Sequence, residues 1–405
     1  MTVLFLDPVG TLGGAERSLV DLVASLRAAE PSLPIGLILG AEGPLAAEVR
    51  AHGAEVRVLP LPRRLMRAGD HSMAGLADVA RHSPALLSAG ASLGTYAREL
   101  DRVIRSFGPA VIHSNGMKMH LLSAMLPRRG VRTVWHMRDF VGQRTVMAPV
   151  LRAVEARVDA IVAISQSIAE DAARTLRRQD VAVVYNGIDT RRFTPVGDVA
   201  DLDALAGLPE ARPGTLRFGL VATYARWKGQ EVFIEAAARF ARRAPRASAR
   251  FYVIGGTAYD TDSSQFSREE LQGRIAQLGL EGFVGLVPFL ASPETAYRSL
   301  DVAVHASTRP EPFGRTIAEG MACGRTLIVA REGGAAELGT DGVDVIRITP
   351  RDPDALASAM LELAADPARR TAIGTAARQT ALSRFSRERL GPEVLSVYRR
   401  IGAIR

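Results

Sequence analysis

The sequence predicts an α/β protein made of two Rossmann-like domains in series, each built on a parallel β-sheet. Short, nearly continuous apolar runs alternate with amphipathic helical stretches along the chain, which is the pattern of a parallel sheet covered on both faces. At 405 residues the chain exceeds what a single core usually supports. Hydrophobic residues make up 47% of it, enough apolar material for two cores.

Both halves of the chain repeat this alternation. In the first half we expect strands at residues 3–6, 35–39, 55–59, 110–113, 132–136, 160–164 and 182–185, with helices that include 16–29 and 43–52. In the second half we expect strands at residues 217–222, 250–254, 284–288, 302–305 and 326–330, with helices that include 230–243, 268–278 and 315–322.

A stretch rich in Pro, Gly and Asp at residues 189–216 predicts the join between the domains. We therefore expect an N-terminal domain at 1–190, a C-terminal domain at 191–385, and a final helix at 386–405 that packs back on the first domain. Ligands in such folds bind beyond the carboxyl ends of the strands. A cleft in which the two domains face each other is the expected site.

The net charge of +8 does not indicate a nucleic-acid-binding protein. Dividing the chain at residue 190 gives each half a net charge of +4, so neither half is a basic module. No RNA-binding signature or zinc-finger spacing accompanies the arginines. A basic run that contains Arg57, Arg63, Arg64 and Arg67 suggests that the first domain touches an anionic membrane or a phosphate-bearing acceptor. A solvated loop is the alternative.

The lone cysteine, Cys323, excludes an intrachain disulfide and is given no chemistry. We expect a cytoplasmic protein, because the sequence has no secretory signal and no stretch long enough to span a membrane. Contact with the inner face of the membrane is a further hypothesis.

The segment from Glu311 to Glu319, EPFGRTIAE, carries the clearest functional signal. Pro312 and Gly314 break structure before a helix that starts at Arg315. One carboxylate could bind hexose hydroxyls and the other ribose hydroxyls, while free N–H groups at the helix N-terminus face a diphosphate. Two surface glutamates near a helix start are the alternative.

Other candidate residues follow predicted strands. A turn with Gly13 and Gly14 precedes a helix, and glycines there let a ligand approach the backbone closely. His136 ends a strand, where a neutral imidazole could accept a hydrogen bond from a sugar hydroxyl and be oriented by Arg138 or Asp139. A tight βα turn and a structural histidine are the respective alternatives. Asn115 closes the preceding strand.

The E-x7-E segment resembles that of the retaining glycosyltransferases of family 4, also called glycosyl transferases group 1. Its flanks, SLDVAVHAST and GMACGRTLIVAREGGAAEL, agree as well. The GGAE loop, the HxxD-like segment at His136, the NGID segment, a Lys-Gly pair and a C-terminal Gly-Gly loop all follow in the family's order, so the resemblance extends over most of the chain.

The resemblance implies a GT-B fold and metal-independent transfer, with retention, from a UDP- or GDP-sugar to a glycan, lipid-linked or small-molecule acceptor, without a further cofactor. It implies catalytic roles for His136, Lys228 and Glu311, and we add Arg226 to this set as a fourth candidate. The implied donor-binding residues are Gly13, Gly14, Gly256, Phe289, Leu290, Phe313, Gly314, Arg315, Thr316 and Glu319, and the acceptor-side residues are Glu16, Asn115, Arg138 and Asp139. No metal ligands are expected.

One position departs from the family. Its members carry an arginine where this chain has Thr223, five residues before Lys228. Arg226 is the candidate to replace that cation, since a guanidinium binds phosphate bidentately; a solvated surface charge is the alternative.

Two other functions remain open. A sugar-nucleotide 2-epimerase could use the same architecture, but it needs additional acid and base residues. A catalytically inactive relic that binds sugar nucleotides is the other, for which the departure at Thr223 leaves room.

Overall fold

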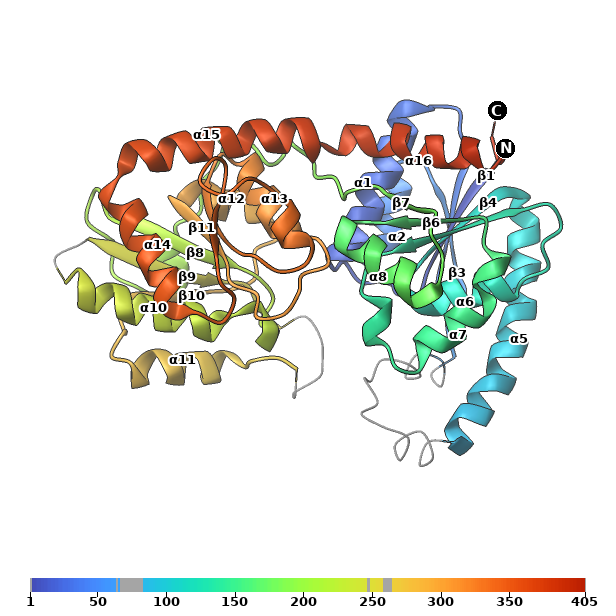
Figure 1. Cartoon of the computed structure of the whole chain (residues 1–405), viewed down its shortest axis with the longest axis horizontal. Coiled ribbons are helices and arrows are strands. Elements are labelled where there is room, and N and C mark those ends of the chain that lie inside the picture. The colour runs from blue at the N-terminus through green and yellow to red at the C-terminus, as the bar shows by residue number, and fades with distance from the viewer. Residues whose placement is uncertain (1, 63–64, 66–82, 246–247, 258–263, 405) are drawn as a thin grey trace. The chain divides into compact units, whose positions relative to one another are not determined.

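The computed structural model describes residues 2–62, 65, 83–245, 248–257 and 264–404, and for residues 83–92 the backbone only. The described residues form two compact units. Unit 1 comprises Met1–Gly187 and Arg387–Arg405, and unit 2 comprises Ile188–Ser386. The last helix of the chain thus belongs to unit 1 (Figure 1).

Unit 1 is built on a parallel sheet of seven strands in the order β3-β2-β1-β4-β5-β6-β7. These strands are β1 (Thr2–Asp7), β2 (Ile35–Leu39), β3 (Glu55–Val58), β4 (Pro109–Asn115), β5 (Arg132–Met137), β6 (Ala160–Ala163) and β7 (Val181–Val183). The helical segments are α1 (Gly14–Ala29), α2 (Pro44–Ala51), α5 (Ser83–Phe107), α6 (Met117–Met125), η1 (Val141–Gln143), α7 (Met147–Val154), η2 (Glu155–Arg157), α8 (Gln166–Leu176), η5 (Arg387–Arg389) and α16 (Leu390–Arg400).

Helices cover both faces of this sheet, as expected for a parallel sheet whose strands are apolar throughout. Side chains of α1, α2 and α16 form one hydrophobic core with the sheet, and side chains of α5 and α6 form the other. Helix α16 lies directly against α1, although more than 350 residues separate them in the sequence (Figure 1).

Unit 2 repeats the plan with a parallel sheet of six strands in the order β10-β9-β8-β11-β12-β13. The strands are β8 (Leu216–Val221), β9 (Ala249–Ile254), β10 (Val284–Val287), β11 (Val302–His305), β12 (Thr326–Ala330) and β13 (Ile346–Ile348). The helical segments are α9 (Leu202–Ala206), η3 (Arg226–Lys228), α10 (Gln230–Arg243), α11 (Arg268–Gln277), α12 (Pro293–Ser299), α13 (Arg315–Ala322), η4 (Gly334–Glu337), α14 (Pro353–Ala365) and α15 (Pro367–Arg384).

Aromatic rings concentrate in the core of unit 2. Phe218 of β8 stacks on Phe251 of β9 at 5.1 Å between ring centres, and Phe240 of α10 contacts both rings edge-on. Such contacts fix how α10 lies on the sheet, and α10 begins at the turn that carries Lys228.

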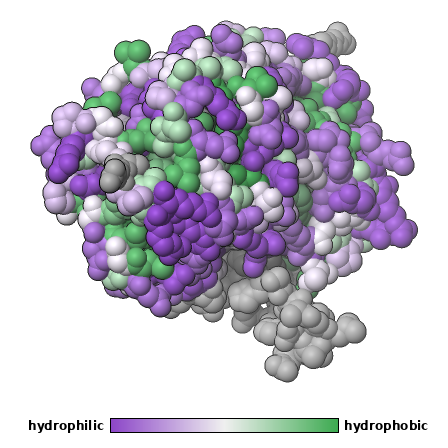
Figure 2. Space-filling model, turned by 60° about the vertical axis from the view of Figure 1, so that its left-hand side comes forward, coloured by the Kyte–Doolittle hydropathy of each residue, from purple (hydrophilic) through white to green (hydrophobic). Residues whose placement is uncertain are grey.

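The surface shown in Figure 2 is mostly hydrophilic, with hydrophobic residues in scattered groups. Among the described helices, none is both long enough and apolar enough to cross a bilayer.

Candidate functional site

The strand order of each unit indicates where a ligand binds. In an open parallel sheet, ligands bind beyond the carboxyl ends of the two strands at which the order reverses. These strands are β1 and β4 in unit 1, and β8 and β11 in unit 2. In unit 2, Lys228 follows β8 and Glu311 follows β11. Most of the predicted residues follow these strands or their neighbours.

A glycine turn brings Lys228 to the end of β11. Gly229 follows η3 with a φ of 83° and begins α10. A Cβ at this position would lie 1.9 Å from the carbonyl oxygen of Ala306, so the turn requires glycine on grounds of both backbone conformation and space. The amide of Thr308 closes the same junction by donating to the Trp227 carbonyl at 2.7 Å.

Lys228, which is half-buried, forms an ion pair with the buried Glu311. The Lys228 Nζ donates to both carboxylate oxygens of Glu311, at 2.9 Å to Oε1 and 2.7 Å to Oε2. The ammonium also lies 4.0 Å from the centre of the Trp227 ring, where the ring face attracts a cation. The structure therefore brings together two of the four predicted catalytic residues.

Two further residues, neither of them predicted from the sequence, hold Glu311. The Ser307 hydroxyl donates to Oε2 at 3.0 Å, and His305 Nε2 lies 3.2 Å from the same oxygen. Both side chains are buried. Their position at and just after the end of β11, four and six residues before Glu311, is the signal that could have identified them.

The charge of Glu311 is preserved by these partners. Burial by itself raises the pKa of the carboxyl, but Lys228 and His305 act in the opposite direction and hold the pKa well below its ordinary value. Glu311 is thus a fixed anion at neutral pH, able to accept hydrogen bonds but not to donate a proton.

The backbone around Glu311 is fixed by a glycine pair after β12. The Gly334 amide donates to the Glu311 carbonyl at 2.7 Å. Gly333 has a φ of 64°, and a Cβ there would lie 2.5 Å from that same carbonyl oxygen. The C-terminal Gly-Gly loop therefore holds the backbone of the first glutamate of the E-x7-E segment.

The second glutamate, Glu319, lies on α13 with its carboxylate buried. Arg315 Nε donates to its Oε1 at 2.8 Å, and the Tyr297 hydroxyl lies 3.4 Å from Oε2. Tyr297 also donates to the Thr316 carbonyl at 3.0 Å. Phe313 places its ring in the core, 5.9 Å from that of Phe385.

Gly256 and Phe289 lie side by side beyond β9 and β10. A Cβ built on Gly256 would be 3.6 Å from the Cβ of Phe289. The Phe289 side chain is 66% exposed, which is unusual for a large hydrophobic residue, and Leu290 beside it is half-buried. An exposed ring next to a bare backbone is suited to stacking against a planar base.

Arg226 does not join Lys228 and Glu311 in this structure. Its guanidinium donates to Glu270 Oε1 of α11 at 2.6 Å and lies 4.4 Å from the centre of the Phe266 ring. At Thr223, the carbonyl accepts a hydrogen bond from Gln230 at 2.7 Å.

In unit 1 the Gly13-Gly14 turn leads from β1 into α1. The Gly13 amide donates to Glu16 Oε2 at 2.9 Å, so this predicted acceptor-side carboxylate also caps the helix. Asp7, at the end of β1, is buried, and burial followed by the charge of Glu16 raises its pKa well above the ordinary value. Burial likewise raises the pKa of Glu16.

The ends of β4 and β5 bring together three of the predicted residues. Asn115 and His136 are register partners, and Arg138 Nε donates to Asn115 Oδ1 at 2.9 Å. Asn115 Nδ2 and His136 Nε2 are both buried, and neither has a hydrogen-bond partner among the described residues. Buried polar atoms without partners are rare in proteins, so these two mark a place where a ligand would complete the hydrogen bonding.

Arg138, and not Asp139, is the neighbour that faces His136. Arg138 Nη2 lies 3.5 Å from His136 Nδ1, and Nη1 donates to Asn186 Oδ1 at 3.2 Å. Asp139 pairs with Arg144 and accepts from the Phe140 amide at 2.8 Å.

The basic run of the first domain lies partly outside the described residues, since Arg63, Arg64 and Arg67 are not among them. Arg57 lies in β3, where it pairs with Glu55 at 2.7 Å and its guanidinium lies 4.4 Å from the centre of the Phe107 ring. Cys323 is buried, which raises its thiol pKa to about 12. Among the described residues, no group of three or more His, Cys, Asp or Glu side chains could hold a metal ion.

Known protein families match both halves of the chain. The profile of Glycosyltransferase Family 4 matches residues 44–192, and that of Glycosyl transferases group 1 matches residues 215–366. The alpha-maltose-1-phosphate synthase of Mycolicibacterium smegmatis is 28% identical over 385 residues, which cover 87% of this chain and 96% of that protein. A D-inositol 3-phosphate glycosyltransferase of Nocardiopsis dassonvillei is 32% identical over 57% of this chain and 54% of its own length.

Solved structures share the fold over the whole chain. The HepE protein of Anabaena, solved in complex with UDP, has a TM-score of 0.79 and 23% identity, covering 99% of this chain and 100% of its own. The sucrose-phosphate synthase of Thermosynechococcus elongatus has a TM-score of 0.76 and 19% identity, covering 100% of both chains. The fold is thus GT-B, and the chain belongs to the family 4 glycosyltransferases, the glycosyl transferases group 1.

Proposed function

We propose that this glycosyltransferase moves a hexose from a nucleoside diphosphate sugar to an acceptor hydroxyl, with retention of anomeric configuration and without a metal ion. The observation that carries the proposal is the partly buried ion pair of Lys228 and Glu311 at the point where the strand order of unit 2 reverses. This pair places a cation and a fixed anion within one donor-sized site, with the N-terminus of α13 directly after it.

Each part of this site has a role in the proposed reaction. Lys228 stabilises the negative charge that develops on the leaving diphosphate, together with the free amides at the start of α13. Glu311 accepts hydrogen bonds from hexose hydroxyls, and Glu319 accepts them from the ribose. Phe289 and Leu290 frame the base, and the diphosphate lies against Gly256 and the Gly333-Gly334 turn.

Unit 1 carries the other predicted site residues. We assign His136 and the Gly13-Gly14 turn to the sugar or its phosphate, and Asn115, Arg138, Asp139 and Glu16 to the acceptor side. The unpartnered buried atoms of Asn115 and His136 support this assignment.

The proposed chemistry is a same-face displacement. The acceptor oxygen bonds to the anomeric carbon as the bond from that carbon to the phosphate oxygen breaks, and the departing phosphate takes the acceptor proton. Lys228 and the helix amides lower the barrier by stabilising the leaving group, which is the same effect a metal ion would otherwise supply.

The choice of donor and acceptor follows the relatives. Solved neighbours were crystallised with UDP and with UDP-glucose, so UDP-sugars are the first donors to test and GDP-sugars the second. The similar enzymes are named for maltose 1-phosphate and inositol 3-phosphate, so phosphorylated sugars and polyols are the first acceptors.

A donor and acceptor screen tests the proposal. The release of nucleoside diphosphate is measured with UDP-, GDP- and ADP-sugars, with and without each acceptor, in buffer containing EDTA. We expect one donor to be turned over in EDTA and the product to keep the anomeric configuration of the donor by proton NMR. An inverted product or a strict need for a divalent cation would contradict the corresponding part of the proposal. Donor binding without turnover would favour the inactive relic, and conversion of the donor to its 2-epimer would favour an epimerase.

A further inference from the structure

Three buried side chains of unit 1 form a continuous hydrogen-bonded chain that ends at His136. The Tyr398 hydroxyl of α16 lies 2.7 Å from His113 Nδ1, and His113 Nε2 lies 3.0 Å from His136 Nδ1. Tyr398 and His113 are fully buried, and His136 is 3% exposed. The C-terminal helix therefore reaches the candidate site through a single intermediate residue.

Both imidazoles are neutral in this environment. Burial, followed by the charge of Arg138, lowers the pKa of His113 and of His136 well below the ordinary value. A neutral imidazole carries one proton on its two ring nitrogens, so one nitrogen donates a hydrogen bond and the other accepts. The direction of one hydrogen bond in the chain consequently determines the direction of the next.

The tyrosine end of the chain determines that direction. The Tyr398 hydroxyl has one described hydrogen-bond partner, His113 Nδ1. If the phenol accepted from Nδ1, its own buried proton would have no acceptor among the described residues, which is costly. Tyr398 therefore donates to His113 Nδ1, and the proton of His113 resides on Nε2 and points to His136.

Arg138, which lies beside His136 at the other end of the hydrogen-bonded chain, independently indicates the same proton positions. Arg138 has only donors, and its Nη2 lies 3.5 Å from His136 Nδ1. A lone pair on Nδ1 suits both Arg138 and the Nε2 proton of His113. Both ends of the chain thus leave the proton of His136 on Nε2.

We propose that Tyr398 and His113 are positioning residues that hold His136 as the Nε2-protonated tautomer, so that it presents a hydrogen-bond donor to the ligand. This reverses the role expected from the sequence, in which the imidazole accepts a hydrogen bond from a sugar hydroxyl. The amide Nδ2 of Asn115, also a donor, is buried beside it without a described partner. The ligand group at this place must then be an oxygen that accepts hydrogen bonds, as a hydroxyl or phosphate oxygen does.

The proposal rests on the proposed function for its catalytic consequence, but the tautomer can be measured without any activity. The protein is labelled with ¹⁵N-histidine, and multiple-bond proton–nitrogen correlation spectra distinguish protonated from unprotonated ring nitrogens. His113→Asn and His136→Asn spectra assign the signals. We expect unprotonated Nδ1 and protonated Nε2 for both rings near neutral pH, and the opposite tautomer for either ring would overturn the proposal.

Removal of the Tyr398 hydroxyl group tests the role of this residue. In Tyr398→Phe the His113 Nδ1 loses its donor, so we expect mixed tautomers at His113 and a fall in kcat/KM of about fivefold to tenfold, the usual effect of one buried hydrogen bond. Tyr96→Phe is the matched control, because the Tyr96 hydroxyl is also buried and donates at 2.8 Å to a carbonyl, that of Leu59. This control should lose similar stability but keep the histidine spectra and kcat/KM of the wild type.

The outcomes separate the two proposals. An unchanged His113 tautomer in Tyr398→Phe, or equal losses of kcat/KM in both tyrosine variants, would overturn the positioning role. A wild type that shows the expected tautomers but transfers no sugar would refute the proposed function and leave the hydrogen-bond chain intact.

Discussion

Two buried carboxylates show how the surroundings of a single residue determine its charge. Glu311 has Lys228 and His305 as neighbours, which hold its pKa well below the ordinary value despite burial. Asp7 is also buried, but its neighbour Glu16 is acidic and its pKa is raised. The first is therefore suited to a permanent anion in a donor site, whereas the second is readily protonated.

The contribution of Lys228 to turnover can be measured by replacing it. Lys228→Ala removes the cation proposed to stabilise the leaving diphosphate, and we expect kcat to fall by roughly 10²- to 10³-fold. Steady-state kinetics over a donor series would measure this effect, with circular dichroism to verify the fold. A Lys228→Ala enzyme with wild-type kcat would remove the residue from the catalytic set.

Arg226→Ala tests whether the neighbouring guanidinium replaces the family arginine absent at Thr223. Its pairing with Glu270 is exposed to solvent on both sides, and such a pair contributes little to stability because solvent screens it, so the guanidinium can exchange Glu270 for a phosphate. We expect the donor KM to rise about tenfold with a smaller change in kcat. A donor KM equal to that of the wild type would assign Arg226 to the packing of α11 alone.

At the scale of elements, the sequence predicted most of the strands and helices, because apolar periodicity and breakers act locally. Helices α10 and α13 begin and end at the predicted residues. Strand β13 was missed, because three residues with a central arginine carry little periodicity. The contacts of His305, Ser307 and Tyr398 were also missed, since they depend on which strand ends and helices the tertiary fold brings together.

The turn between β8 and α10 is the element most sensitive to a single methyl group. Gly229→Ala combines a positive φ with a Cβ 1.9 Å from a backbone carbonyl. We expect a loss of roughly 2–3 kcal/mol or more in the unfolding free energy of unit 2 and a displaced Lys228, measured by denaturant unfolding and donor kinetics.

Gly273→Ala is the matched control in the exposed interior of α11. A Cβ at Gly273 meets no atom within 4 Å, and alanine has the higher helix propensity. This variant should gain about 0.5–1 kcal/mol and keep wild-type kinetics. Equal stability losses in the two glycine variants would contradict the description of the turn.

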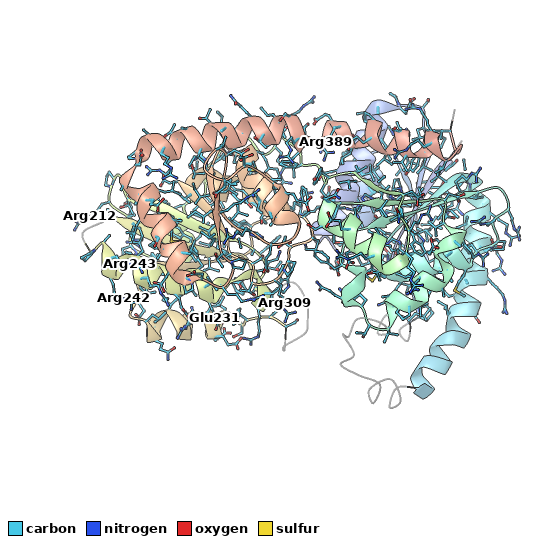
Figure 3. All side chains as sticks on the ribbon, in the orientation of Figure 1. Arg212, Glu231, Arg242, Arg243, Arg309 and Arg389 are labelled. Carbon is cyan, nitrogen blue, oxygen red and sulfur yellow. The ribbon has the colours of Figure 1, made fainter. Side chains whose placement is uncertain are left out.

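At the scale of the whole molecule, the arginine-rich composition serves structure as much as binding. Arg243, labelled in Figure 3, lies at the end of α10 and pairs with Asp354 of α14 at 2.6 Å. Arg298 donates to three backbone carbonyls between residues 192 and 198. Arg389, labelled in Figure 3, donates to the carbonyls of Tyr185 and Asn186 and so fixes the start of α16. Composition alone could not separate these uses from phosphate binding, because the fold decides which carboxylate or main-chain carbonyls each arginine reaches.

Buried histidines make the stability of unit 1 depend on pH. Burial and Arg138 lower the pKa of His120 to about 3, whereas the unfolded value is about 6.5. Between these values the unfolded chain binds the additional proton, so the unfolding free energy falls as the pH drops below about 6.5. Asp7, with its raised pKa, acts in the opposite direction.

The comparison of wild type with His120→Gln isolates the contribution of this one residue. Between about pH 7.5 and about pH 5.5, we expect the variant to lose roughly 1.4 kcal/mol less unfolding free energy than the wild type. Urea unfolding at the two pH values measures the difference. Parallel losses in the two proteins would show that His120 is protonated equally in the folded and unfolded states.

The assignment of the donor site is tested most directly by the rate of nucleoside diphosphate release from the preferred sugar nucleotide. This rate is compared between the wild type and Glu311→Gln. The amide keeps the shape of the side chain but cannot pair with Lys228 as an anion, so we predict a loss of roughly 10²-fold or more. The control is Glu235→Gln on α10, which removes a partly exposed carboxylate that pairs with Arg239 and with Arg274. This variant should retain the wild-type rate. A Glu311→Gln enzyme as fast as the Glu235→Gln enzyme would contradict the assignment of the donor site.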